Sequence, residues 1–170
     1  FLFLEKNKNK ILSLNGDVIQ KTIIDSCTIK KKVIEKDEKE KNLRKVLNFG
    51  HTFAHSFEAS LRYSKKLNHG EAVILGIITA LRFSLHIQLI STKDYNSIIN
   101  HVTDVKLPSN LKNYFSYKDL DKILTFMSKD KKNISKKINL ILLKKIGTTF
   151  ISNEYSQLKI KKFLKKELIN

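Results

Sequence analysis

The sequence predicts a mainly α-helical fold with one small β-hairpin. Apolar residues recur at helical spacing along most of the 170 residues. Residues 137–152 are instead rich in β-forming side chains around a Lys-Lys-Ile-Gly step, which indicates a hairpin. There is no internal repeat and no Gly- or Pro-rich linker. We therefore expect one helical domain over residues 1–170.

The expected helices follow one another with short breaks. They cover residues 18–41, 42 to about 63, 70 to about 90, a segment restarting near 93, 116–130 and 153–170. The first follows the turn signal Asn15-Gly16-Asp17 and carries an apolar stripe of Ile19, Ile23, Cys27 and Ile34. A Ser or Thr caps the helix near Lys93, and Pro108 breaks the chain after it. In the last helix Leu158, Leu164 and Leu168 should face inward.

Composition excludes several classes of protein. The net charge of +17 suggests nucleic-acid binding, but arginine occurs only at 44, 62 and 82, and the lysines are spread along the chain. The apolar stretch 72–90 is too interrupted to cross a membrane. A single cysteine, Cys27, fits a reducing cytoplasm. The chain starts at Phe1 in mid-pattern without a signal peptide, so we expect its true beginning to lie upstream.

Lys30 stands out on the first helix. It lies three residues after Cys27 and four before Ile34, so it joins the apolar stripe. Lysine is rarely buried unless it is paired. Two explanations remain open: the stem packs while the ammonium reaches water, or the ammonium binds an anion.

A row of polar residues follows along the second helix. Its members are separated by three or four residues, which places them on one face of a continuous helix: Glu40, Arg44, Asn48, His51, His55, Glu58 and Arg62. The neighbouring face should be core and carries Leu43, Leu47, Ala54, Phe57 and Leu61. A solvated face is the ordinary explanation, but solvated faces of this chain are lysine-rich. The row therefore indicates fixed polar geometry.

Three histidines within nineteen residues indicate a metal site. His51 and His55 are spaced for one helix face, and His69 precedes the buried helix. Thr52 stands where the zincin pattern has its glutamate, so a metalloprotease is excluded. Glu71 is a candidate third ligand, but capping its helix or supporting His69 is the favoured role. The competing explanation is that the three histidines are structural. His86 and His101 stand alone in the sequence, and we expect them to be structural.

The ordered blocks "LNFGHTFAHSFE", "LNHGEAVILG", "DKKN" and "INLILLKKIG" resemble 3-dehydroquinate synthase. The likeness runs from about Phe1 to Ile151 and implies the helical C-terminal domain of the dehydroquinate synthase-like fold. It also implies NAD and a divalent metal, zinc or cobalt, as cofactors, and a homodimer. The implied reaction, in the shikimate route to aromatic amino acids, converts the sugar-acid phosphate DAHP to 3-dehydroquinate and phosphate, with NAD accepting and returning a hydride.

The resemblance implies a role for each matching residue. His51 and His69 match the two histidine metal ligands, and His55 matches a histidine at the substrate phosphate that helps to move protons. The substrate contacts are matched by Lys30, Arg44, Asn48, His55 and either Lys131 or Lys132, and Glu40 matches an acidic active-site residue. Of these, Lys30, Glu40 and His55 are the expected catalytic residues.

The chain also departs from the family pattern. The family's third metal ligand and its NAD contacts belong to an upstream segment, so we expect this chain alone to be inactive. Ala54 and Ile77 replace a usual glycine and a common methionine. Three kinds of alternative remain: another sugar-phosphate cyclase or a glycerol-dehydrogenase-like enzyme, a basic nucleic-acid-binding helical module, and a purely structural fragment.

Overall fold

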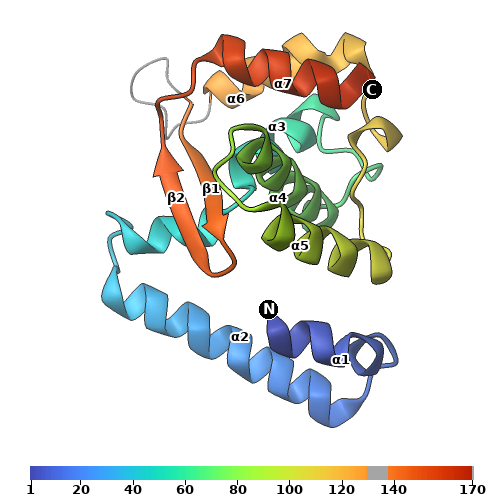
Figure 1. Ribbon diagram of the computed structural model, residues 1–170, viewed down its shortest axis with the longest axis vertical. Helices are drawn as coiled ribbons and strands as arrows, with labels where there is room; N and C mark the ends of the chain where they lie inside the picture. Colours follow the sequence, from blue (N-terminus) through green and yellow to red (C-terminus); the bar gives the residue numbers. More distant parts are fainter. Residues whose placement is uncertain (130–137, 170) are drawn as a thin grey trace. The chain divides into compact units, whose positions relative to one another are not determined.

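The computed structural model describes residues 1–129 and 138–169, which form two compact units, Phe1–Asn48 and Phe49–Asn170. Helices dominate both units, and an antiparallel hairpin belongs to the second (Figure 1). The predicted mainly α fold with a small hairpin is confirmed. Among the described residues, no helix combines the length and hydrophobicity needed to cross a bilayer.

The first unit contains α1 (Leu2–Leu12), α2 (Gly16–Lys36) and the 3₁₀ helix η1 (Leu43–Asn48). The Asn15 side chain caps α2 by accepting the Val18 N–H at 3.2 Å. The apolar stripe predicted on α2 is present, but no residue of α1 or α2 is buried, and the Ile23 side chain is 57% exposed. Helix α1 was not predicted, because its apolar residues form no buried face.

Helix α2 ends at Lys36, five residues earlier than predicted, and Asp37 follows it as the C-cap. The Asp37 carboxylate accepts the backbone N–H groups of Lys41, Asn42 and Arg44 at 2.8–2.9 Å. These bonds lower the pKa of Asp37 below its usual 3.8, and the bond from the Arg44 N–H has the largest effect. Glu40 lies inside this turn with a left-handed φ of 53°. One carboxylate thus shapes the segment that connects α2 to η1.

The second unit is built from helices and a hairpin. Its elements are α3 (His51–Ser60), α4 (His69–His86), α5 (Thr92–Asp104), η2 (Leu111–Asn113), η3 (Tyr117–Asp119), α6 (Leu120–Lys129), β1 (Leu140–Lys145), β2 (Thr148–Ser152) and α7 (Gln157–Ile169). Ser91 caps α5 as predicted, by accepting the Asp94 N–H at 3.1 Å. Gly147 turns the hairpin with a φ of 83°, and Leu140 of β1 pairs with Ser152 of β2.

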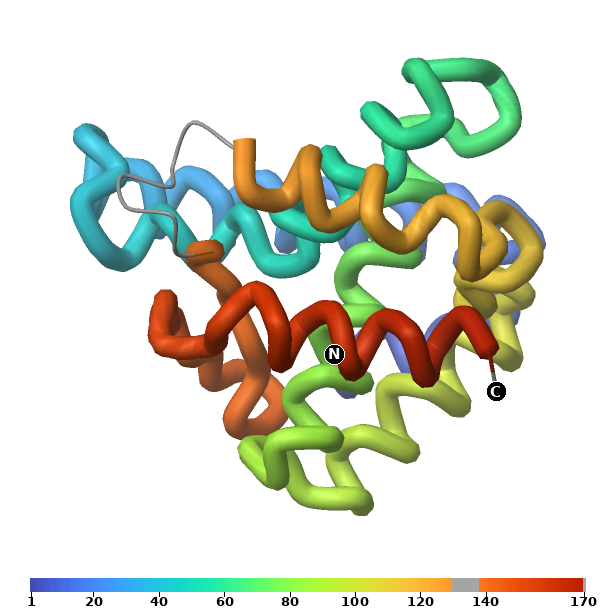
Figure 2. The backbone as a smooth tube through the Cα atoms, turned by 90° about the horizontal axis from the view of Figure 1, so that it is seen from above, coloured from blue at the N-terminus to red at the C-terminus, as the bar shows by residue number. Residues whose placement is uncertain are grey.

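The core of the second unit lies where α3 and α4 pack together. The hairpin lies beside these helices, and α6 and α7 run side by side (Figures 1 and 2). Phe53 and Phe57 of α3, Phe83 of α4 and Met127 of α6 are almost completely buried. The Ser84 hydroxyl ties α4 to β1 by accepting the Leu143 N–H at 3.1 Å.

Helix α7 follows its predicted pattern only in part. Leu164 and Leu168 are buried as expected, whereas Leu158 is 61% exposed. Ile160, two residues after Leu158, is buried, and two residues on a helix point to nearly opposite sides. The prediction for Leu158 was therefore wrong.

The continuous helix predicted over 42–63 is also wrong. The 3₁₀ helix η1 ends at Asn48, Gly50 adopts φ 83°, and α3 then starts at His51. The seven polar residues of the predicted row therefore do not share one helix face. A Cβ on Gly50 would lie 2.5 Å from the Ile77 backbone nitrogen of α4, so this turn accepts only glycine. Ala54 and Phe57 are buried as predicted, but Leu43 is 42% exposed.

Replacing Gly76 by alanine should destabilise the protein. A Cβ there would lie 2.9 Å from the Ala54 backbone nitrogen and would also meet the Gly50 carbonyl oxygen. We expect overpacking to outweigh the gain in helix propensity and to lower the free energy of unfolding by about 1–3 kcal/mol. Chemical denaturation measures this. Gly70→Ala is the control, because nothing lies within 4 Å of its added Cβ. A Gly76→Ala protein as stable as wild type would contradict the close packing.

Protonating Asp37 should release the turn that follows α2. Because its pKa is lowered in the folded state, its stabilising bonds are complete above the usual value of 3.8 and are lost as pH falls through the lowered pKa. We expect the amide chemical shifts of Lys41, Asn42 and Arg44 to titrate together below pH 3.8. Asp37→Asn should abolish that shared titration, whereas Asp25→Asn on α2 should preserve it. Independent titration midpoints for the three amides would refute the assignment.

Candidate active site

His51 and His55 project from the start of α3. The left-handed Gly50 places His51 at the first position of the helix, and His55 follows one turn later. Their ring centroids are 5.5 Å apart. The Nδ1 of His51 lies 3.4 Å from the backbone carbonyl oxygen of Phe49, so its Nε2 is the nitrogen suited to a ligand. The Thr52 hydroxyl donates to the Asn139 carbonyl at 3.0 Å and fixes this end of α3 near the hairpin.

His69 is the first residue of α4, which starts one residue before the predicted Gly70. Asn68 caps the helix, and the Glu71 carboxylate accepts the Asn68 N–H at 2.9 Å in a capping box. The prediction that Glu71 caps its helix is confirmed. The ring centroids of His69 and His51 are 6.3 Å apart. Two imidazoles bound to one zinc ion through bonds of about 2.0–2.1 Å have centres roughly 5–6 Å apart, so a small side-chain movement would let both bind one ion.

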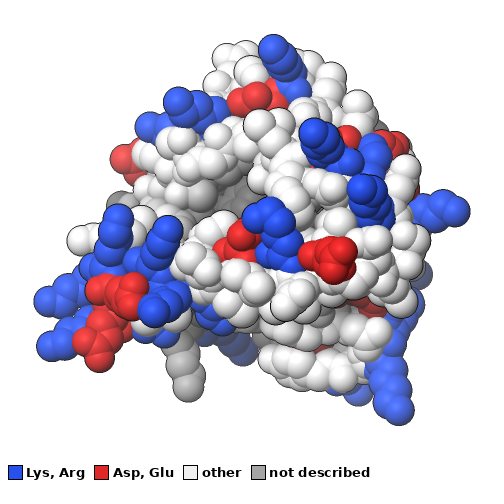
Figure 3. Space-filling view, turned by 90° about the horizontal axis from the view of Figure 1, so that it is seen from below, with Lys and Arg blue, Asp and Glu red and all other residues white. Residues whose placement is uncertain are grey.

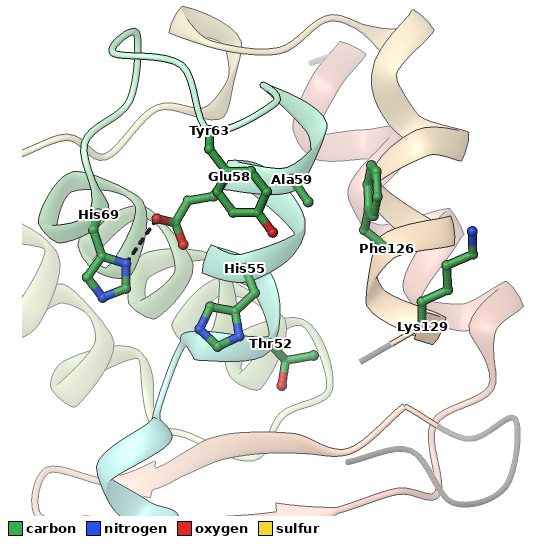
Figure 4. Close-up of a pocket in the computed structure, with 8 residues that line it drawn as sticks. All are labelled: Thr52, His55, Glu58, Ala59, Tyr63, His69, Phe126 and Lys129. Carbon is green, nitrogen blue, oxygen red and sulfur yellow. Dashed lines mark hydrogen bonds and ion pairs between the residues drawn. The ribbon is translucent and has the colours of Figure 1, made fainter. Parts of the chain in front are cut away.

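Glu58 joins this group from the far end of α3. Its carboxylate lies 3.0 Å from the Nδ1 of His69 (Figure 4). The Glu58 side chain is 12% exposed, and that of His69 is 64% exposed. Both line a pocket of about 520 Å³ together with Thr52, His55, Ala59, Tyr63, Phe126 and Lys129. The pocket is open to solvent and is lined by two imidazoles and one partly buried carboxylate.

The donor atoms fit part of a zinc or cobalt site. Neutral imidazole nitrogens are common ligands of both metals, and His51 and His69 each have the Nδ1 next to an oxygen. Within residues 1–129 and 138–169, no group of three His, Cys, Asp or Glu side chains is arranged to hold a metal ion. The described residues therefore supply a partial ligand set.

Four of the expected substrate and catalytic residues belong to the first unit. The Asn48 side-chain amide donates to the Glu40 carboxylate at 2.7 Å. Arg44 donates to the Glu38 carbonyl at 2.7 Å. Lys30 lies on the apolar stripe of α2 and is exposed, as are Ile23 and Cys27 of the same stripe. The structure brings Glu40 and Asn48 into contact within this unit.

Several pocket residues were missed by sequence reasoning. Lys131 and Lys132 lie outside the described residues, and the pocket lysine that the structure shows is Lys129 of α6. In a chain with 33 Lys and Arg residues, nothing in the sequence marks this one. Nothing in the sequence marked Tyr63 and Phe126 as pocket residues either. Glu58 was noticed in the polar row, but its partnership with His69 was not.

Solved structures share the fold. A 2-epi-5-epi-valiolone synthase from Streptomyces hygroscopicus subsp. jinggangensis 5008, with NAD+ and Zn2+ bound, matches 97% of this chain and 45% of its own, with a TM-score of 0.80 and 18% identity. A 2-deoxy-scyllo-inosose synthase complexed with carbaglucose-6-phosphate, NAD+ and Co2+ matches 86% of this chain and 40% of its own, with a TM-score of 0.65 and 24% identity. At these identities the likeness shows the fold alone.

Sequence relatives are closer. A 3-dehydroquinate synthase of Pelagibacter ubique (strain HTCC1062) is 55% identical over 168 residues, which are 99% of this chain and 46% of that enzyme. One from Rhodopseudomonas palustris (strain TIE-1) is 32% identical over 99% of this chain and 45% of its own. The chain thus spans about half the length of these relatives. The family described as 3-dehydroquinate synthase C-terminal matches residues 1–133, and the chain belongs to that family.

Proposed function

We propose that this chain is the metal- and substrate-binding half of a 3-dehydroquinate synthase, which converts DAHP to 3-dehydroquinate and phosphate. The observation that carries the proposal is the clustering of three imidazoles: the His51 ring lies 5.5 Å from that of His55 and 6.3 Å from that of His69, and the latter two line one pocket. The 55% identity to a relative of that name supports the same reaction. The proposal includes NAD as a cofactor, a homodimeric enzyme and a cytoplasmic location.

His51 and His69 are the proposed metal ligands. A bound zinc or cobalt ion would supply Lewis acidity toward the substrate oxygens, and NAD would supply a reversible hydride acceptor. The protein's own contribution is to hold two imidazoles at the first positions of α3 and α4. Their ring separation of 6.3 Å supports this assignment. The third ligand of the family is proposed to come from outside this chain.

Binding DAHP requires several cationic and amide donors, because the substrate carries a phosphate and a carboxylate. Lys30 and Arg44 are the proposed cations and Asn48 the proposed amide donor. The bond between Asn48 and Glu40 fixes the orientation of that amide, since the carboxylate holds its nitrogen at 2.7 Å. Lys131 or Lys132 is proposed as a further cation, and Lys129 in the pocket is a third candidate.

His55 is the proposed proton carrier at the substrate phosphate. Its ring is exposed in the pocket and lies one helical turn from His51. Imidazole exchanges protons near neutral pH, so a ring at this position can accept a proton as phosphate departs. Glu40 and Lys30 complete the proposed catalytic set.

Another sugar-phosphate cyclase is the alternative function. The structural neighbours named above close other rings, and they share the fold with this chain. Identity favours 3-dehydroquinate synthase, because the relatives so named reach 55% whereas the two cyclase structures stay below 25%. Comparing turnover of DAHP with that of other phosphorylated sugars distinguishes the two functions.

Nucleic-acid binding is the candidate from a different class. On the face shown in Figure 3, basic side chains are interspersed with acidic ones and do not form a single stripe. Binding of that kind would weaken steeply with salt and would not depend on His51.

Removing either proposed ligand should weaken metal binding. We expect His51→Ala and His69→Ala each to reduce the zinc affinity of this chain at least tenfold, because each deletes a coordinating nitrogen. Calorimetric zinc titration measures the affinity. His101→Ala on α5 is the matched control and should bind zinc like wild type. Unchanged zinc affinity in both His51→Ala and His69→Ala would refute the metal site.

This chain by itself should not catalyse the reaction. We expect no phosphate release from DAHP and no measurable NAD affinity, since the family binds NAD through its other domain. Adding the N-terminal domain of the Pelagibacter relative, in one polypeptide with this chain, should restore phosphate release. Turnover of DAHP by the 170 residues alone would contradict this prediction.

A further inference from the structure

We propose that Glu58 is a positioning residue that sets the tautomer of His69 and thereby directs its Nε2 toward the metal. The inference rests on the metal site of the proposed function and extends it to a residue outside the ligand set. The Glu58 carboxylate oxygen lies 3.0 Å from the Nδ1 of His69, and because a carboxylate can only accept, this bond requires the proton on Nδ1. Of the two ring nitrogens, Nε2 then keeps the lone pair needed for coordination.

The burial of Glu58 favours a functional contact over a surface ion pair. Its side chain is only 12% exposed, whereas four carboxylates that lie within 3.0 Å of a lysine or arginine nitrogen are 21% to 80% exposed: Glu5, Asp25, Asp121 and Glu167. Removing a carboxylate from water is costly unless a hydrogen bond or a charge compensates it. In this +17 chain, the partner that Glu58 meets is a histidine.

The placement of Glu58 on α3 explains the contact. Glu58 lies seven residues after His51 and three after His55, so all three project from one side of the helix. His69 comes from the first turn of α4 and reaches the carboxylate across the space between the two helices (Figure 4). One helix thus carries a proposed ligand and the group that orients the other ligand.

A carboxylate bound to the second nitrogen of a metal-binding imidazole has two effects. It holds the ring in one orientation, and it makes the coordinating nitrogen a stronger donor. Loss of such a partner typically weakens metal binding by about 10–100-fold. The Nδ1 of His51 lies 3.4 Å from the backbone carbonyl oxygen of Phe49, a longer contact that no side-chain substitution removes.

The tautomer can be measured without any metal. Long-range ¹H–¹⁵N spectra of the metal-free chain, at a pH where His69 is neutral, report which ring nitrogen carries the proton. We expect the Nδ1–H form of His69 in wild type and a mixture of both forms in Glu58→Ala. Glu58→Gln keeps an oxygen acceptor and should retain most of the Nδ1–H form. Glu154→Ala removes an exposed carboxylate of the same unit and serves as the control.

Zinc titrations of the same proteins complete the test. We expect Glu58→Ala to bind zinc about 10–100-fold more weakly than wild type, with Glu58→Gln between the two and Glu154→Ala unchanged. A wild-type tautomer and unchanged zinc affinity in Glu58→Ala, while His69→Ala loses zinc, would overturn this inference and leave the metal site intact. A Glu58→Gln loss equal to that of His69→Ala would also overturn it, by making Glu58 a direct ligand. If neither His51→Ala nor His69→Ala loses zinc, the proposed function fails.

Discussion

The close approach of α3 and α4 is the constraint on which the rest of the site depends. Gly76 lets the backbone of α4 pass against the turn at Gly50 and against Ala54, where an added Cβ would find no room. The same turn needs the left-handed φ of Gly50, which ends η1 and starts α3 at His51. Only because the helices touch here do the rings of His51 and His69 come within 6.3 Å. The arrangement of the proposed metal ligands thus depends on the backbone packing of α3 against α4.

Helical periodicity predicted the elements whose burial matches their sequence pattern. Helices α4 and α5 and the hairpin were found because apolar spacing, a capping serine and β-forming residues agree there. The break at Gly50 was missed because steps of three and four continue in sequence across it. A 3₁₀ turn followed by a left-handed glycine changes the direction of the chain without changing that spacing. Helix α1 was missed for the opposite reason, because it has no buried face.

The site was predictable where its chemistry is local in sequence. The spacing of His51 and His55 within one helix, and of His69 at the start of another, indicated a cluster, and the rings do lie together. Glu58 and Lys129 were not predictable in the same way. The role of Glu58 depends on a partner eleven residues away on another helix, and Lys129 looks like every other lysine until α6 packs against α3.

The two units hold their functional residues by different physical means. In residues 49–170 a buried core of aromatic and aliphatic side chains fixes the helices that carry the histidines. In residues 1–48 neither α1 nor α2 contains a buried residue, and the segment bearing Glu40 and Arg44 is shaped by hydrogen bonds to Asp37. Packing resists pH, whereas bonds to a carboxylate do not. The helices that carry the proposed metal ligands should therefore keep their arrangement under acidic conditions in which the segment bearing Glu40 and Arg44 loses its hydrogen bonds to Asp37.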